Sequence, residues 1–168
     1  MKMFTSLCFA LFATVAVPYD TAHASPADEA AIHKLLDGWA KAFHDRNIEA
    51  IMAMYPRGNE FVAYDVVPPL RYVGYDAYKK DYQDFLGQYR GPITIEYRDL
   101  KVVADDRIAY SHGLEHLSGE LKNGQKSDMW LRFTSCFQKV GGKWLDMHDH
   151  VSVPADLDSG KAMVNLTP

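Results

Sequence analysis

The chain has 168 residues, with 18 lysines and arginines against 22 aspartates and glutamates, and its formal net charge is −4 at pH 7. This length allows one domain, and it is large enough to bury a substantial core. The mild acidity gives no electrostatic reason to expect a nucleic acid or an anionic membrane surface as a partner.

Residues 1–24 are predicted to be a signal peptide. A short basic start precedes the apolar run LCFALFATVAV, which is too short to span a membrane comfortably, and AHA at 22–24 fits an A-x-A cleavage site. We therefore expect export to the periplasm or secretion, no membrane association after cleavage, and one domain over residues 25–168. Cleavage leaves Cys136 as the single cysteine, so no intrachain disulfide can form.

Two helices are predicted directly after the cleavage site. Ser25 followed by proline, with acids in the next turn, is typical of a helix start, and apolar residues at helical spacing continue to Phe43. Asn47 caps a second, short helix that Pro56 ends.

A strand, a loop and a third helix are predicted next. The stretch NEFVAYDVV (59–67) favours a strand, and PPLRYVG (68–74) favours a loop. The third helix begins near Tyr75, where aromatic residues recur at alternating steps of three and four.

The pattern then changes to four long strands at 92–103, 107–119, 127–140 and 143–153. Turn signals separate them, and Asn-Gly at 123–124 is the strongest of these signals. Helices followed by an antiparallel meander predict an α+β fold. A curved sheet around a helical layer leaves a concavity, where small-molecule sites tend to form.

Two stretches carry a resemblance to a known family. YDVVPPLRYVGYDAYKKDY (64–82) and RFTSCFQKVGGKWLDMHDHVSVP (132–154), with the order of elements, resemble the SnoaL-like branch of the nuclear transport factor 2 superfamily, often labelled ketosteroid-isomerase homologues. The W-x-x-x-H-x-H-x-S run from Trp144 is also similar to the association domain of calcium/calmodulin-dependent kinase II. The resemblance covers residues 25–155.

This resemblance implies a cone-shaped fold, with three N-terminal helices packed on a curved antiparallel sheet. It implies no single activity, because the superfamily contains isomerases, cyclases, dehydratases and proteins without catalysis.

The last predicted strand carries a row of polar residues. Asp146, His148, His150 and Ser152 stand two apart, so a regular strand places them on one face. A metal site is disfavoured, because same-face neighbours lie about 7 Å apart on one strand and no metal-ligand spacing is present. The row fits a ligand pocket, but it equally fits a dimer interface or a buried polar network.

The hairpin at Gly141-Gly142 decides which residues join this row. A plain two-residue turn pairs Ser135 with His148 and Phe133 with His150, whereas a three-residue loop with a glycine bulge pairs Thr134 with His148 and Arg132 with His150. We favour the bulge, because it gathers on one side Trp130, Arg132, Thr134, Trp144, His148 and His150.

Asp65 is a candidate general base. In the ketosteroid isomerases that the chain resembles, the base is an aspartate at the end of the first strand, and Asp65 occupies the comparable place. Burial in an apolar pocket raises the pKa of a carboxyl group and suits it to proton transfer beside a carbonyl. The alternative is that Asp65 bonds backbone amides of the loop that follows it. Oxyanion partners could come from Tyr55, Tyr64, Arg132 or His148, but none matches the isomerase pattern.

Two functions remain open. The first is an isomerase-type or lyase-type enzyme acting on a hydrophobic carbonyl compound, with Asp65 and His148 as catalytic residues. The second is a non-catalytic module for oligomerisation or for binding a small acidic or aromatic ligand, held by Arg132 and the histidines. The predicted ligand-binding residues are Trp39, Tyr55, Tyr64, His116, Trp130, Arg132 and His150.

Both hypotheses require the imidazoles of the last strand to face an enclosed hollow under the helices. A homodimer is expected in either case, because open sheet faces in this superfamily are usually paired. No cofactor is expected, since the sequence contains no GxGxxG, GxxxxGK or GxSxG motif.

Overall fold

The computed structural model describes residues 25–168, and the predicted signal peptide lies outside the described residues. The helices are α1 (Pro26–His44), α2 (Ile48–Ile51), the 3-10 turn η1 (Met52–Met54) and α3 (Tyr75–Leu86). The strands are β1 (Val62–Tyr64), β2 (Tyr72–Val73), β3 (Tyr89–Ala104), β4 (Ile108–Leu121), β5 (Lys126–Val140), β6 (Lys143–Ser152), β7 (Ala155–Asp156) and β8 (Lys161–Ala162). This order confirms the predicted three helices and four-stranded meander.

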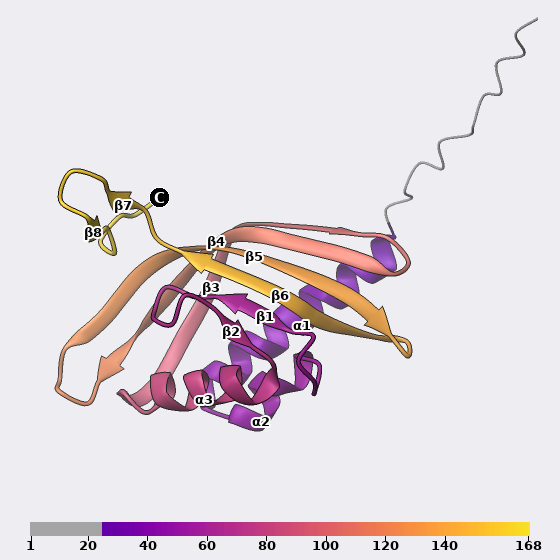
Figure 1. Cartoon of the computed structure of the whole chain (residues 1–168), viewed down its shortest axis with the longest axis horizontal. Coiled ribbons are helices and arrows are strands. Elements are labelled where there is room, and N and C mark those ends of the chain that lie inside the picture. The colour runs from indigo at the N-terminus through magenta and orange to yellow at the C-terminus, as the bar shows by residue number, and fades with distance from the viewer. Residues whose placement is uncertain (1–24) are drawn as a thin grey trace, which may run out of the picture.

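Six strands form one sheet in the order β2-β1-β6-β5-β4-β3, and β7 and β8 form a separate hairpin near the C-terminus (Figure 1). Neighbouring strands are antiparallel except β1 and β6, which run parallel. The strand expected at 59–67 is shorter than predicted, and the loop expected at 68–74 contains β2. The α+β prediction is confirmed, with a mixed, mostly antiparallel sheet.

The helix starts follow the predicted capping. Ser25 Oγ accepts a hydrogen bond from the Asp28 amide at 3.3 Å, and Asn47 Oδ1 accepts one from the Ala50 amide at 3.1 Å. After α1, Arg46 donates to the Leu86 and Tyr89 carbonyls, both at 2.7 Å. Arg46 therefore ties the end of α1 to the end of α3 and the start of β3.

The long strands bend over α1, while α2 and α3 lie against the lower part of the same side (Figure 1). The bend coincides with a break in the β3–β4 register between Arg98 and Lys101, where Asp99 has φ of +54°. Gly113 of β4 lies opposite this break, and a Cβ on it would lie 3.1 Å from the Arg98 carbonyl oxygen. The glycine therefore permits the close approach that accompanies the bend. Within residues 25–168, no helix is long and apolar enough to cross a membrane.

Candidate functional site

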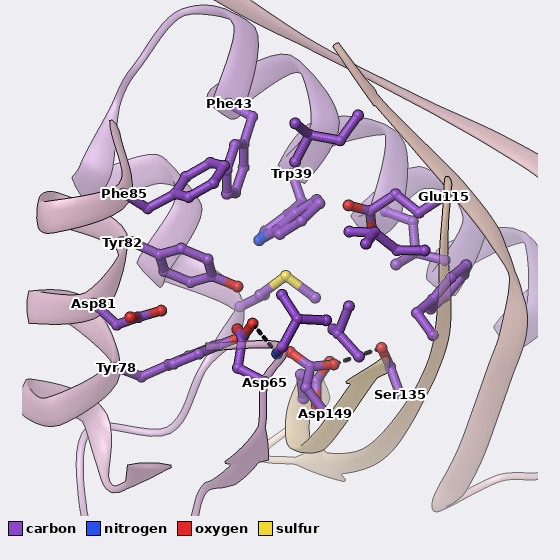
Figure 2. A pocket seen from close by; sticks show the side chains of 18 of the residues that line it. Trp39, Phe43, Asp65, Tyr78, Asp81, Tyr82, Phe85, Glu115, Ser135 and Asp149 are labelled. Atoms are coloured by element: carbon purple, nitrogen blue, oxygen red, sulfur yellow. Dashed lines mark hydrogen bonds between the residues drawn. The ribbon is translucent and has the colours of Figure 1, made fainter. Parts of the chain in front are cut away.

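A cavity of about 100 Å³ lies between the concave face of the sheet and the helices (Figure 2). Eight aromatic residues contribute to its wall, alongside aliphatic side chains, and they are Trp39, Phe43, Tyr55, Tyr78, Tyr82, Phe85, Tyr97 and Phe133. Carboxyl groups interrupt this wall, and they belong to Asp65, Asp81, Glu115, Asp146 and Asp149. None of the lining residues, which all lie within the described chain, is a lysine, arginine or histidine.

Three of the residues predicted for the site line this cavity. Trp39 comes from α1, Tyr55 follows η1, and Asp65 follows β1 directly. Their locations agree with the expected concavity, and their roles stay predictions.

The prediction that His148 and His150 face the hollow is wrong. Neither lines the cavity, and both pack against Tyr64 on the outer face of the sheet, with ring centroids 5.0 and 5.7 Å from that ring. His148 Nδ1 lies 2.8 Å from the Val62 carbonyl, to which it donates, and so links β6 to β1. Both hypotheses required these imidazoles in the hollow, so neither holds in the form stated above, and what remains of them depends on Trp39, Tyr55 and Asp65, which do line the cavity.

The cause is a bulge within β6 rather than at the hairpin. Val140 pairs with Lys143, so Gly141-Gly142 is a plain two-residue turn, and both glycines have positive φ as such a turn requires. The register then shifts by one, because Phe137 pairs with Asp146 but Cys136 pairs with His148.

Neither expected register is correct. The bulge leaves Asp146 and Asp149 buried, while His148 and His150 lie on the other side. Asp146 Oδ1 accepts a hydrogen bond from the His148 amide at 3.0 Å and thereby supports the bulge.

The remaining predicted ligand-binding residues, Tyr64, His116, Trp130 and Arg132, do not line the cavity either, so that expectation is also corrected. They occupy outward positions of β1, β4 and β5, because strand alternation directs their neighbours inward. His116 stacks on Trp130 at 4.6 Å, and hydrogen bonds to Asp128 and Glu96 raise its pKa. Trp144 points inward, so it does not share a side with the two histidines, although Trp130, Arg132 and Thr134 do.

Asp65 both lines the cavity with a raised pKa and bonds a backbone amide of the loop that follows it, which were the two alternatives considered for it. Its Oδ1 accepts a hydrogen bond from the Val66 amide at 2.6 Å, and the Tyr78 hydroxyl donates to Oδ2 at 3.4 Å. Burial, and then the negative charge of Asp81, raise the pKa of Asp65 to about 6. At neutral pH the group is therefore mostly ionised but ready to take up a proton.

Glu115, which we did not predict, contributes a second carboxyl group to the cavity. The residue is 6% exposed, and burial followed by the charges of Asp149 and Asp65 raises the pKa of its carboxyl group to about 8. It is therefore mainly protonated at pH 7. A signal was present in the sequence, because Glu115 and Leu117 share one face of their strand and Leu117 is an obvious core residue.

A hydrogen-bonded network at the other end of the cavity was also missed. Asp149 accepts hydrogen bonds from the Tyr55 hydroxyl at 3.0 Å and the Ser135 hydroxyl at 2.6 Å. The Tyr82 hydroxyl lies 2.9 Å from that of Tyr55 and extends the network to α3. Burial and the neighbouring Asp149 raise the pKa of Asp146 well above its ordinary range. The alternation of Asp149 with Val151 and Val153 was the overlooked sign that Asp149 faces inward.

The indole N–H of Trp39, which lines the cavity, is a hydrogen-bond donor without a partner in the described part of the chain. Its indole nitrogen is buried and makes no hydrogen bond to any described residue. Figure 2 shows the indole lying between Tyr82 and Glu115, with Asp65 on another side of the same space. A ligand oxygen in the cavity would satisfy this donor. Within residues 25–168, no group of three or more His, Cys, Asp or Glu side chains is arranged to hold a metal ion.

Several solved structures share this architecture. An NTF2-like protein of unknown function from Pseudomonas putida KT2440 matches with a TM-score of 0.78 and 30% identity, covering 87% of this chain and 100% of that one. A candidate calcium/calmodulin-dependent protein kinase II association domain from Xanthomonas campestris matches at 0.66 and 24%, covering 89% and 99%. A ketosteroid isomerase-like protein from Erwinia carotovora atroseptica matches at 0.64 and 18%, covering 76% and 97%.

None of the curated proteins compared with this chain matches it. The family model of the SnoaL-like domain, however, matches residues 32–156. This range contains strands β1 to β6 and the three helices, except for the first turns of α1. It also contains every residue of the cavity wall. The chain therefore belongs to the SnoaL-like family, within the nuclear transport factor 2-like superfamily.

Proposed function

We propose that this protein is a proton-transfer enzyme of the isomerase type, which acts on a small hydrophobic carbonyl compound bound in the cavity. One observation carries the proposal: two carboxyl groups line the same aromatic cavity with well-separated pKa values, about 6 for Asp65 and about 8 for Glu115. At pH 7 the first can accept a proton while the second still holds one. Such a division between base and acid is typical of sites that move protons.

The chemistry follows from these two states. The Asp65 carboxylate removes a proton from the carbon next to the substrate carbonyl, and the electron pair of that C–H bond forms a carbon–carbon double bond. The carbonyl oxygen gains the negative charge, which the O–H of Glu115 and the indole N–H of Trp39 stabilise by hydrogen bonding. Asp65 then returns the proton to another carbon of the conjugated system, so the double bond moves and no group is lost.

An assay of Asp65→Asn tests this role. Small cyclic β,γ-unsaturated ketones are suitable substrates, because their conjugated products absorb in the ultraviolet. We expect the substitution to lower turnover by about 10²- to 10⁴-fold, since the amide cannot accept the proton. Asp106→Asn, in the exposed β3–β4 turn, is the matched control and should keep wild-type turnover. Unchanged turnover in Asp65→Asn would remove Asp65 from the mechanism.

A non-catalytic binding module is the second candidate. The hydrogen bond from the Val66 amide to Asp65 favours it, because it gives Asp65 a structural reason to be present. Under this function, ketones would raise the melting temperature of wild type and Asp65→Asn alike, without turnover. Arg132 and the histidines cannot hold an acidic ligand inside the cone, because they lie outside the cavity.

We also propose export and dimerisation. The leader sequence supports export, and a mature protein that begins at Ser25 would confirm cleavage after Ala24. The aromatic and histidine side chains on the outer face of the sheet support a homodimer, in which that face meets a second copy.

A further inference from the structure

The carboxyl groups of the cavity have no cationic partner. They come from four different parts of the fold: Asp65 follows β1, Asp81 lies on α3, Glu115 on β4, and Asp146 and Asp149 on β6. The other titratable groups on the wall are tyrosines, and none of the five carboxyl groups forms an ion pair with a described residue. Asp65 is mostly ionised at pH 7, and Glu115 can lose its proton when a cation binds beside it, so this apolar space favours a positive charge over a negative one.

Two further groups show that this space suits a ligand. Glu115 is more than nine-tenths buried and lines the cavity, and no hydrogen bond to another described residue influences its carboxyl group. The indole N–H of Trp39, which also lines the cavity, is buried without a partner among the described residues. Buried polar groups normally find partners, so an unpaired donor and an unpaired carboxyl group in the wall of one cavity fit a bound molecule.

The aromatic wall is suited to positive charge. Tyr82 packs against Tyr78 at 4.4 Å, against Phe43 at 5.3 Å and against Tyr55 at 6.2 Å. Ring faces attract cations when water is excluded, and aromatic walls recognise organic ammonium groups in this way. The same wall contains no lysine, arginine or histidine whose positive charge could compensate an anion.

The size of the cavity limits its occupant. At about 100 Å³ it is smaller than the apolar cavity of about 150 Å³ that accommodates benzene. A compact molecule with one small ring fills it, unless the loop after Asp65 moves to enlarge the mouth.

We propose that the cavity selects a small hydrophobic organic cation, such as a protonated cyclic amine, and excludes anions. The inference rests on the proposed function in taking this cavity as the substrate site. It narrows the substrate to carbonyl compounds that also carry a basic nitrogen. The indole N–H of Trp39 faces the substrate oxygen, and the carboxylates supply the counter-charge.

Calorimetric titration with three matched probes tests charge selection. Cyclopentylammonium, cyclopentanol and cyclopentanecarboxylate share a ring and differ in charge. We expect the ammonium ion to bind at least about tenfold more tightly than the alcohol, and the carboxylate not to bind. Affinity for the ammonium ion should rise between pH 5 and pH 8, because the cation favours ionised carboxyl groups, and binding should release protons.

Asp65→Asn provides the matched variant, because Asp65 is only partly buried and its amide analogue keeps the shape of the site. We expect the variant to lose about tenfold in affinity for the ammonium ion and nothing for cyclopentanol. Asp106→Asn should bind all probes as wild type does.

The outcomes separate the two proposals. Equal or tighter binding of cyclopentanol overturns charge selection and leaves the cavity as a ligand site. Turnover of uncharged ketones without any binding of the ammonium ion likewise overturns this inference alone. The absence of both binding and turnover overturns the proposed function as well.

Discussion

The chemistry of single carboxyl groups here depends on what surrounds each of them. Asp65 has a backbone amide and a tyrosine hydroxyl as donors, which partly offset the burial that raises its pKa. Glu115 has no such donors, and burial raises its pKa further. The two carboxyl groups therefore differ in protonation at pH 7, because burial and nearby carboxylates raise both pKa values but only Asp65 has hydrogen-bond donors that lower its pKa again.

This difference predicts a bell-shaped pH dependence of kcat/KM. Turnover should rise as the pH increases through about 6, because Asp65 must lose its proton before it can act as a base. It should fall as the pH increases through about 8, because Glu115 then loses the proton that it donates to the substrate oxygen. Steady-state rates between pH 4.5 and pH 9.5 measure both limbs.

Glu115→Gln tests whether Glu115 causes the fall in kcat/KM above about pH 8. The amide keeps a donor at every pH, so the fall above about 8 should disappear while the rise near 6 stays. A variant whose alkaline limb matches that of wild type would assign that limb to another group.

Sequence patterns located some of these residues and missed others for a physical reason. Asp65 was found through the resemblance, because the general base of the similar isomerases follows their first strand, and a place at the end of a strand can be located without knowing the register. Glu115 and Asp149 could be found only by deciding which side of a strand faces the core, and that decision depends on register. A register shift of one residue exchanges the sides of the sheet on which His148 and Asp149 lie. We expected His148 to face the cavity, but Asp149 faces it instead.

At the scale of elements, bulges determine what faces the cavity. The four long strands and their turns follow from hydrophobic alternation and turn residues, so they could be predicted. The extra residue in β6 and the break in β3 depend on local bonds, such as that from the His148 amide to Asp146, which composition does not reveal. The curvature of the sheet and the residues that face the cavity could therefore not be predicted from the sequence patterns.

The plain turn at Gly141-Gly142 fixes the β5–β6 register between the hairpin and the bulge, from the Val140–Lys143 pair to the Phe137–Asp146 pair. Gly142 has φ of +80°, and a Cβ there would meet no atom within 4 Å, so only backbone conformation opposes a larger residue. We expect Gly142→Ala to lower the free energy of unfolding by about 1 kcal/mol. Urea denaturation at pH 7 measures this change.

Gly38, within α1, is the matched control. A Cβ there also meets no atom within 4 Å, but the residue is helical, so Gly38→Ala should raise the free energy of unfolding by about 0.5 to 1 kcal/mol. Opposite signs are therefore expected for the same chemical change. A neutral result for Gly142→Ala would mean that the turn does not require a positive φ.

At the scale of the whole molecule, the two faces of the sheet differ in the side chains that they carry. Its concave face meets the helices and encloses the carboxyl groups. Its outer face carries aromatic and imidazole rings, including Tyr64 against the two histidines and Trp130 against His116. Tyr64 and Tyr110 are more than 40% exposed there. Aromatic rings gathered on one face are typical of a surface that meets another protein, and a two-fold axis would pair the face with itself.

A negative charge in this face should therefore separate the proposed dimer. We expect wild type to sediment as a dimer at micromolar concentration and Tyr64→Glu to sediment as a monomer, because each subunit would then bury an unpaired carboxylate in the interface. His33→Glu, on the exposed side of α1, adds the same charge away from the sheet and should remain a dimer. A wild-type protein that sediments as a monomer up to high micromolar concentration would exclude this interface. The rings of the outer face would then act only within the sheet, where His148 links β6 to β1.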